Sequence, residues 1–274
     1  MWREIYEVIR QVLDDLGEKN AGLISAGVAF YGLFAIFPGL AATIALFGLV
    51  ADPVVVNSQL NLVRGLMPPE VFDLFEGQIS AILNARSETL GVATAISVGV
   101  ALWSVRAGVA ALIQGINAIF ERPNRGIARH MLVALLMSAS LVGVAIVALL
   151  MVVVAPVVLA LAPFNADQEM LLELLRWIVV VLVMLAGLGI IYRYGPNRRG
   201  HRLGWFTPGA FLVVVLWIGM SVAFSVYVAN FGNYNEVYGS LGAVIVLLFW
   251  FYLSSFLIMV GAAVNVALDR RKPL

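Results

Sequence analysis

The stretch VYGSLGAVIVLLFWFYLSSFLIMVGAAVNVAL, residues 237–268, contains no Asp, Glu, Lys or Arg. It is longer than the roughly 20 apolar residues that an α-helix needs to cross a hydrocarbon core of about 30 Å. A helix can lie in such an environment because it satisfies its backbone hydrogen bonds internally. The stretch therefore predicts a membrane-spanning helix, and the rest of the chain repeats the pattern.

Four further stretches are equally free of these charged residues, and another, Leu90–Ile113, is interrupted only by Arg106. The chain is 62% hydrophobic and 12% charged, whereas a soluble domain carries about 25% charged residues. We therefore predict an all-α, polytopic membrane protein with a six-span membrane domain at residues 20–268. The further charge-free stretches are 20–51, 131–166, 177–192 and 203–235. The transmembrane helices are expected near 24–50, 90–113, 131–161, 177–195, 207–230 and 240–266.

The basic residues are concentrated on one side of these spans. That side carries 13 of the 17 Lys and Arg residues, in the segments 1–19, 122–129, 193–202 and 269–274. The other side has only Arg64, Arg86 and Arg176. Because cytoplasmic loops are enriched in Lys and Arg, we predict a multi-pass protein with both termini in the cytoplasm.

Three segments flank or connect the spans. In residues 1–19, apolar residues recur at helical spacing among charged ones, which predicts an amphipathic helix along the inner interface. Two short outer helices are expected in 53–88, because Pro68 and Pro69 suit a first helical turn. They form either a structural cap or part of a gate. Residues 269–274 form a basic cytoplasmic tail. The apolar stripe of the first segment is Ile5, Ile9, Val12 and Leu16.

Arg106 is the exceptional charge within the spans, and at a helical rise of about 1.5 Å per residue it lies toward the cytoplasmic end of 90–113. It has two interpretations. The side chain can extend toward the inner head groups, or it can bind an anion in a cavity, since intramembrane charges usually face the bundle interior or water.

Other polar residues in and next to the spans are candidates to line a substrate path. Asn and Gly favour a tight turn and Tyr favours the membrane interface, so a structural role is the alternative for each. The densest group lies between the last two spans, at Asn230–Ser240. The candidates besides Arg106 are Ser25, Tyr31, Tyr227, Asn230, Asn233, Tyr234, Asn235, Tyr238, Ser240 and Asn265.

Gly32, Pro38 and Pro156 are candidate hinges, because proline inside a spanning helix leaves a carbonyl without its helical partner. Close helix packing alone would also require the small residues. The basic loop Tyr192–Arg202 predicts non-specific contact with anionic lipid head groups, each basic residue contributing about 1 kcal/mol. Its lipid head-group candidates are Arg193, Arg198, Arg199 and Arg202.

The composition speaks against several enzyme classes. There is no Cys, and His130 and His201 are the two histidines. No spacing typical of metal ligands appears, nor a Ser/His/Asp arrangement or a phosphate-binding loop. The basic residues lack the aromatic platform that binds single-stranded RNA. We therefore expect no catalytic residues, no cofactor, no metal and no nucleic-acid partner.

Four motifs carry a family resemblance: SAGVAFYGLFAIFP (Ser25–Pro38), INAIFE (Ile116–Glu121), YRYGPNRR (Tyr192–Arg199) and NFGNYNEVYGSLGAVIVLLFWFYLSSFLIMVGAAVN (Asn230–Asn265). In this order and spacing they resemble the YihY/virulence factor BrkB family of bacterial inner-membrane proteins, once labelled a ribonuclease. The resemblance implies six spans, internal termini and location in the cytoplasmic membrane. One position departs from it, since Ala263 stands where the family commonly has an acidic residue.

We interpret the chain as a transporter or flippase-like protein for a lipid or a polar amphiphilic solute. A non-transporting envelope scaffold is the first alternative, and a membrane-embedded enzyme is the second. The expected partners are membrane lipids, anionic ones in particular, and an unidentified substrate. A homo-oligomer is left open.

Overall fold

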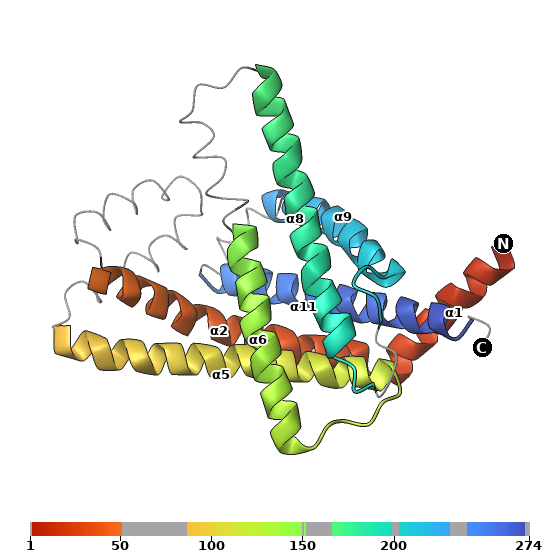
Figure 1. The fold of residues 1–274 in the computed structure, drawn as a ribbon, viewed down its shortest axis with the longest axis horizontal. Helices are drawn as coiled ribbons and strands as arrows, with labels where there is room; N and C mark the ends of the chain where they lie inside the picture. Colours follow the sequence, from red (N-terminus) through yellow and green to blue (C-terminus); the bar gives the residue numbers. More distant parts are fainter. Residues whose placement is uncertain are drawn as a thin grey trace. The chain divides into compact units, whose positions relative to one another are not determined.

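The computed structural model describes residues 2–50, 87–149, 151, 166–198, 203–230 and 240–271, and these residues are almost entirely helical (Figure 1). No β-strand occurs within these ranges, so the all-α prediction is confirmed. The helices are α1 (Trp2–Glu18), α2 (Ala21–Val50), α5 (Ser87–Ile119), α6 (Ile127–Leu149), α8 (Ala166–Tyr194), α9 (Pro208–Asn230) and α11 (Ser240–Asp269).

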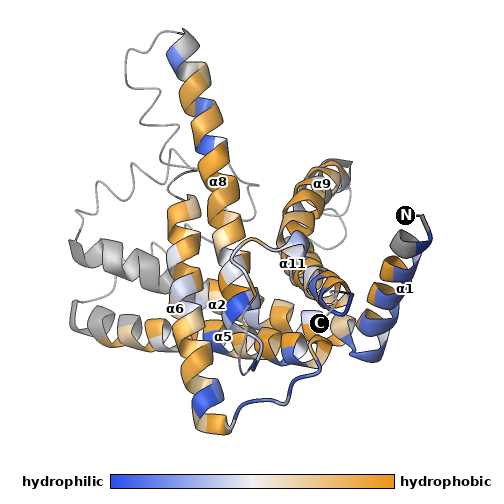
Figure 2. Cartoon of the chain, turned by 45° about the vertical axis from the view of Figure 1, so that its right-hand side comes forward, coloured by the Kyte–Doolittle hydropathy of each residue, from blue (hydrophilic) through white to orange (hydrophobic). Residues whose placement is uncertain are grey.

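Five of the described helices are long and apolar enough to cross a membrane, and there are up to six such spans if one bent pair is counted. The bent pair consists of Tyr6–Glu18 and Ala21–Ile36, which meet at 62°. Residues coloured as hydrophobic dominate the long helices in Figure 2. The chain is therefore a multi-pass membrane protein, as the sequence predicts. The five spans are Ala95–Ile119, Ile127–Ala148, Met170–Tyr194, Pro208–Val228 and Val244–Asp269.

Several helix ends differ from the expected positions. α5 continues to Ile119 rather than ending at 113, because its polar residues remain helical until Glu121 adopts a left-handed φ of 52°. α8 begins at Ala166 rather than 177, since charged residues such as Glu173 are compatible with a helix. The expected outer segment 53–88 lies outside the described residues, except that Ser87 and Glu88 begin α5.

The helices α1 and α2 are separated by a short turn. Asn20 has a φ of 53°, a left-handed conformation that Asn adopts more readily than most residues. The expected amphipathic stripe of α1 is only partly buried, with Val12 and Leu16 inside and Ile9 exposed. The described segment thus has the predicted helical character.

Two compact units divide the chain. The first contains residues 1–26, 109–222 and 253–274, and its core includes Ile113, Tyr192 and Met259. The second contains 27–108 and 223–252. In the second unit, Gly32 contacts the ring of Phe251, and aromatic rings of α9 and α11 pack together.

Within the first unit, α9 and α11 cross at two glycines. Gly209 and Gly261 are so close that a Cβ on either would collide with the backbone carbonyl of the other. The side chain of Asn265 supports the crossing, because its Oδ1 accepts from the Gly209 amide at 2.9 Å and its Nδ2 donates to Thr207 at 3.0 Å. Small residues allow this close approach of helices in a membrane.

Candidate functional site

Arg106 lies close to the middle of the candidate span Ala95–Ile119, because α5 extends further than the sequence indicates. Its Cζ lies 4.3 Å from the ring centroid of Trp103, one turn earlier. Its Nε is buried and has no hydrogen-bond partner among the described residues. The guanidinium therefore retains capacity to bind an acceptor.

The face of α5 that carries Arg106 changes character along the helix. Toward the start of the helix, Leu102 and Trp103 are 53% and 59% exposed. One turn beyond Arg106, Ala110 is buried, and Ile113 is buried one further turn on. Because residues three or four apart share a helix face, Arg106 lies where an exposed apolar face gives way to a buried one.

Two of the tyrosines predicted for a substrate path belong to the same unit as Arg106. Tyr31 is partly exposed, and its Cβ lies 3.3 Å from where a Cβ on Gly108 would be. Tyr227 is also exposed and stacks on Phe224 with ring centroids 6.2 Å apart. The side chains of Asn230 and Ser240, at helix ends, lie outside the description, as do the residues 231–239.

The other path candidates, Ser25 and Asn265, are buried in the first unit. The carbonyl of Ser25 accepts a hydrogen bond from Ser255 at 3.0 Å, while its own Oγ has no partner among the described residues. The Asn265 amide is used in the α9–α11 crossing. The structure thus gives Asn265 a packing role, and its place on a substrate path stays a prediction.

Two hinge candidates, Gly32 and Pro38, lie in α2. α2 continues through Pro38 to Val50 as one helix. Gly32 packs against the ring of Phe251, since a Cβ added at Gly32 would lie 3.5 Å from Cγ of that ring. Pro156 falls outside the described residues. A hinge motion at Gly32 and Pro38 stays a prediction.

A polar network that sequence reasoning missed joins two loops in the first unit. Asn117 is 1% exposed, yet its Oδ1 accepts from the Asn197 amide at 2.8 Å and its Nδ2 donates to Asn124 at 3.0 Å. Asn197 also donates to the carbonyl of Pro123 at 2.9 Å. A buried amide of this kind must be bonded, and the only sequence signal for it was its place inside the INAIFE motif.

Arg125 connects the same two loops by hydrogen bonds. Its guanidinium donates to the carbonyls of Gly195, Pro196 and Tyr194 at 2.7, 2.9 and 3.1 Å. Burial, and secondarily the charge of Arg129, lowers the pKa of Arg125 from its usual value. Several carbonyl dipoles around one cation make a firm junction between residues far apart in the chain.

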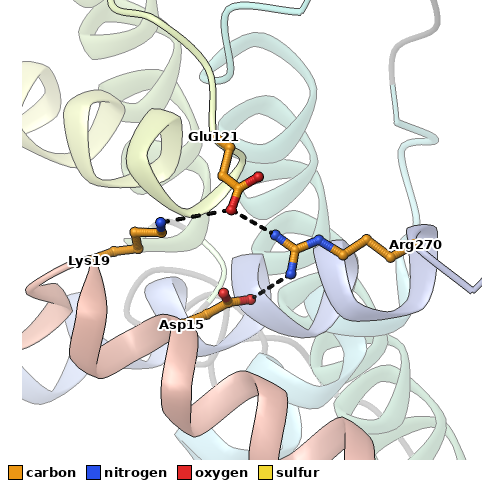
Figure 3. A network of polar contacts seen from close by, with 4 residues as sticks. All are labelled: Asp15, Lys19, Glu121 and Arg270. Atoms are coloured by element: carbon orange, nitrogen blue, oxygen red, sulfur yellow. Dashed lines mark hydrogen bonds and ion pairs between the residues drawn. The ribbon is translucent and has the colours of Figure 1, made fainter.

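Ion pairs bring the two ends of the chain to these loops (Figure 3). Arg270 pairs with Asp15 at 3.4 Å and with Glu121 at 3.1 Å, and Lys19 pairs with Glu121 at 3.7 Å. The loops and chain ends therefore share one side of the first unit, which we call the terminal face. It contains residues 15–20, 120–126, 194–198, 203–207 and 266–271.

The basic residues expected to contact lipid have different surroundings. Arg198 pairs with Asp269 at 2.9 Å and lies 4.7 Å from the centroid of the Phe120 ring. Arg193 donates to the carbonyl of Leu203 at 2.8 Å and lies 5.5 Å from the Trp205 ring centroid. Arg199 and Arg202 lie outside the described residues. The described part also contains no group of three or more His, Cys, Asp or Glu residues that could hold a metal ion.

Comparison with known proteins identifies the family of the chain. Residues 12–273 match the family described as Virulence factor BrkB. The chain belongs to the BrkB family. Among its relatives, the putative ribonuclease-like protein YfkH of Bacillus subtilis is 32% identical over 257 residues, which cover 91% of this chain and 90% of YfkH. The BrkB relatives also include the UPF0761 membrane protein VV0203 of Vibrio vulnificus, 32% identical over 100 residues that cover 36% of this chain and 31% of that protein.

A third BrkB relative, the UPF0761 membrane protein of Vibrio cholerae, is 34% identical over 100 residues, 36% of this chain and 32% of its own length. No solved structure matches the chain. Ala263 stands where the family commonly has an acidic residue, and its side chain is completely buried in α11. Because the residue is alanine, this BrkB protein has no carboxylate at that point of the helix.

Proposed function

We propose that this BrkB family protein is a transporter or flippase-like protein of the bacterial cytoplasmic membrane, and that it moves a lipid or a polar amphiphile past Arg106. The observation that carries the proposal is a guanidinium near the middle of an apolar span, with a buried Nε that has no partner among the described residues. Placing a charged residue at the centre of a spanning helix costs about 2.5–3.5 kcal/mol on insertion scales. A residue retained at that cost is a candidate for function.

The surroundings of Arg106 favour an amphiphile as substrate. A phosphate or carboxylate accepts well from a guanidinium, often through two parallel hydrogen bonds. The exposed side chains of Leu102 and Trp103 continue on the same face of α5 and offer an apolar surface to hydrocarbon chains. One cation beside such a surface complements a molecule with an anionic head and an apolar tail.

The proposal includes no enzymatic activity. The sequence has no phosphate-binding loop, so a gradient or mass action would drive movement. YfkH is named ribonuclease-like. We do not extend that activity to this chain, because its two histidines show no spacing typical of metal ligands and belong to no Ser/His/Asp arrangement. Cleavage of transfer-RNA precursors that followed the purified protein and disappeared in a point variant would contradict this part.

Flux through liposomes tests the role of Arg106. The purified protein is reconstituted alone, and transbilayer movement of fluorescent phospholipids with anionic and zwitterionic head groups is followed by dithionite quenching. We expect Arg106→Gln to slow movement at least tenfold, which corresponds to about 1.4 kcal/mol of lost stabilisation. Arg106→Lys should retain part of the rate, because the charge stays while the bidentate fork is lost.

Arg176→Gln is the matched control for this experiment. Arg176 also lies beside a tryptophan, 5.3 Å from the Trp177 ring centroid, but it already pairs with Glu173 at 3.5 Å. Lipid flux through the Arg176→Gln variant should stay within about twofold of the flux through the natural protein. Full flux in Arg106→Gln would refute the proposed path, and loss of abundance with normal flux per molecule would assign Arg106 a structural role. No flux in the natural protein would favour the scaffold alternative.

The proposed orientation places the terminal face in the cytoplasm. Because the chain has no Cys, single-cysteine variants need no background change. Gly126→Cys lies in a terminal-face loop with open space around its Cβ, and Asn57→Cys lies in the expected outer segment. In intact cells, an impermeant maleimide should label Asn57→Cys and reach Gly126→Cys only after permeabilisation. External labelling of Gly126→Cys would reverse the topology.

A further inference from the structure

The last turn of α8 carries Arg193, which lies beside exposed aromatic rings. We call this group the Arg193 cluster, and it consists of Arg193, Tyr194 and Trp205, with Phe206 next to Trp205 in the sequence. The guanidinium carbon of Arg193 lies 5.5 Å from the Trp205 centroid and 6.0 Å from that of Tyr194. The rings of Tyr194 and Trp205 meet edge to face with centroids 6.0 Å apart. The cluster combines one cation with a broad aromatic surface.

The cluster is held in place by close backbone contacts. Trp205 packs across α8 at Gly189, where an added Cβ would come within 2.8 Å of the Trp205 carbonyl oxygen. One turn further along α8, Nη1 of Arg193 donates to the carbonyl of Leu203 at 2.8 Å. These two contacts fix the ring and the guanidinium relative to each other.

The charge of Arg193 is not neutralised within the described residues. An arginine has five N–H donors, and the bond to Leu203 is its only hydrogen bond there. Its Nε is buried without a partner among those residues. By contrast, Arg198, which follows the end of α8, pairs with Asp269 at 2.9 Å. The structure therefore separates two basic residues that are equivalent in the sequence.

We propose that the Arg193 cluster binds the phosphate of an anionic phospholipid in the leaflet on the terminal face. The cluster lies where the span Met170–Tyr194 ends and the span Pro208–Val228 begins, which is head-group depth. Trp205 and Phe206 are 44% and 59% exposed, as expected of aromatic residues at a membrane interface. They would flank the glycerol and upper acyl chains while the guanidinium binds the phosphate.

This site would hold a lipid in place, and the proposal does not rest on transport past Arg106. It can be tested without transport, by native mass spectrometry of the delipidated full-length protein. The protein is titrated with phosphatidylglycerol or with phosphatidylcholine of the same acyl chains. We expect tighter binding of phosphatidylglycerol, and a loss of about fivefold in Arg193→Gln, the effect of one basic residue at a lipid surface. Phosphatidylcholine, whose choline cation offsets the phosphate charge, should lose clearly less affinity in this variant.

Arg122→Gln controls for diffuse electrostatics, because Arg122 is an exposed charge on the same face. It should lower phosphatidylglycerol affinity by less than twofold. Trp205→Leu, which keeps the charge, should reduce binding about threefold and provides a second variant if Arg193→Gln does not fold. Equal binding of the two lipids, equal losses in Arg193→Gln and Arg122→Gln, or unchanged binding in Trp205→Leu would overturn the site.

Discussion

Gly261→Ala is expected to remove most of the folded protein from the membrane. A Cβ at this position would collide with the hydroxyl of Tyr192 and a methyl of Val213, and would lie 2.8 Å from the carbonyl oxygen of Gly209. Tyr192 cannot easily move, since it is completely buried and donates to the carbonyl of Ile258 at 2.8 Å. Overpacking a core typically costs about 1–3 kcal/mol and occasionally more, and here a backbone must also shift.

The measurement is membrane abundance together with heat-induced loss of the monodisperse peak in detergent. A cost of about 3 kcal/mol predicts a midpoint lower by about 6–12 °C for a chain of this size class. Gly219→Ala is the matched control, because Gly219 lies in α9 with nothing within 4 Å of an added Cβ. Its stability should be equal or slightly higher, since Ala is the better helix former. Similar losses in both variants would contradict the crossing.

The spanning helices could be predicted from the sequence because membrane insertion depends on the length of apolar runs. The stretch 237–268, for example, gives α11 at Ser240–Asp269. Helix ends were less predictable, because α5 and α8 continue through polar residues that are compatible with a helix. Length and hydropathy identify which residues can cross, but they do not record where the backbone stops being helical.

The contacts among polar residues were not predictable. Asn117 has no distinctive signal in a helix, and its partner Asn197 is 80 residues away, a separation that no periodicity encodes. Asn265 was predicted to line a path on the strength of its polarity within a span. The structure shows its amide bonded to Gly209 and Thr207, which depends on how closely α9 approaches α11. Pairing of this kind follows from tertiary packing.

The second large effect is expected from Arg125→Gln, which should release the loop at residues 194–198 from the loop at residues 120–126. The variant loses donors to three carbonyls, and hydrogen bonds to charged groups contribute about 1.5–3 kcal/mol each when isolated. Because Arg125 is only partly buried and the bonds are not additive, we expect about 3 kcal/mol in total. The helices should stay folded, since the loss is confined to the loops.

Hydrogen–deuterium exchange reports this opening directly, because the Asn197 amide is bonded to Asn117 at 2.8 Å beside the Arg125 junction. A loss of about 3 kcal/mol in local stability predicts roughly 100-fold faster exchange of that amide. Arg129→Gln removes the same charge from an exposed neighbour and should leave exchange nearly unchanged. If both variants exchanged alike, the three carbonyl bonds would contribute little, and net charge would account for the stability of the face. Faster exchange in Arg125→Gln alone would mean that the guanidinium joins the two loops.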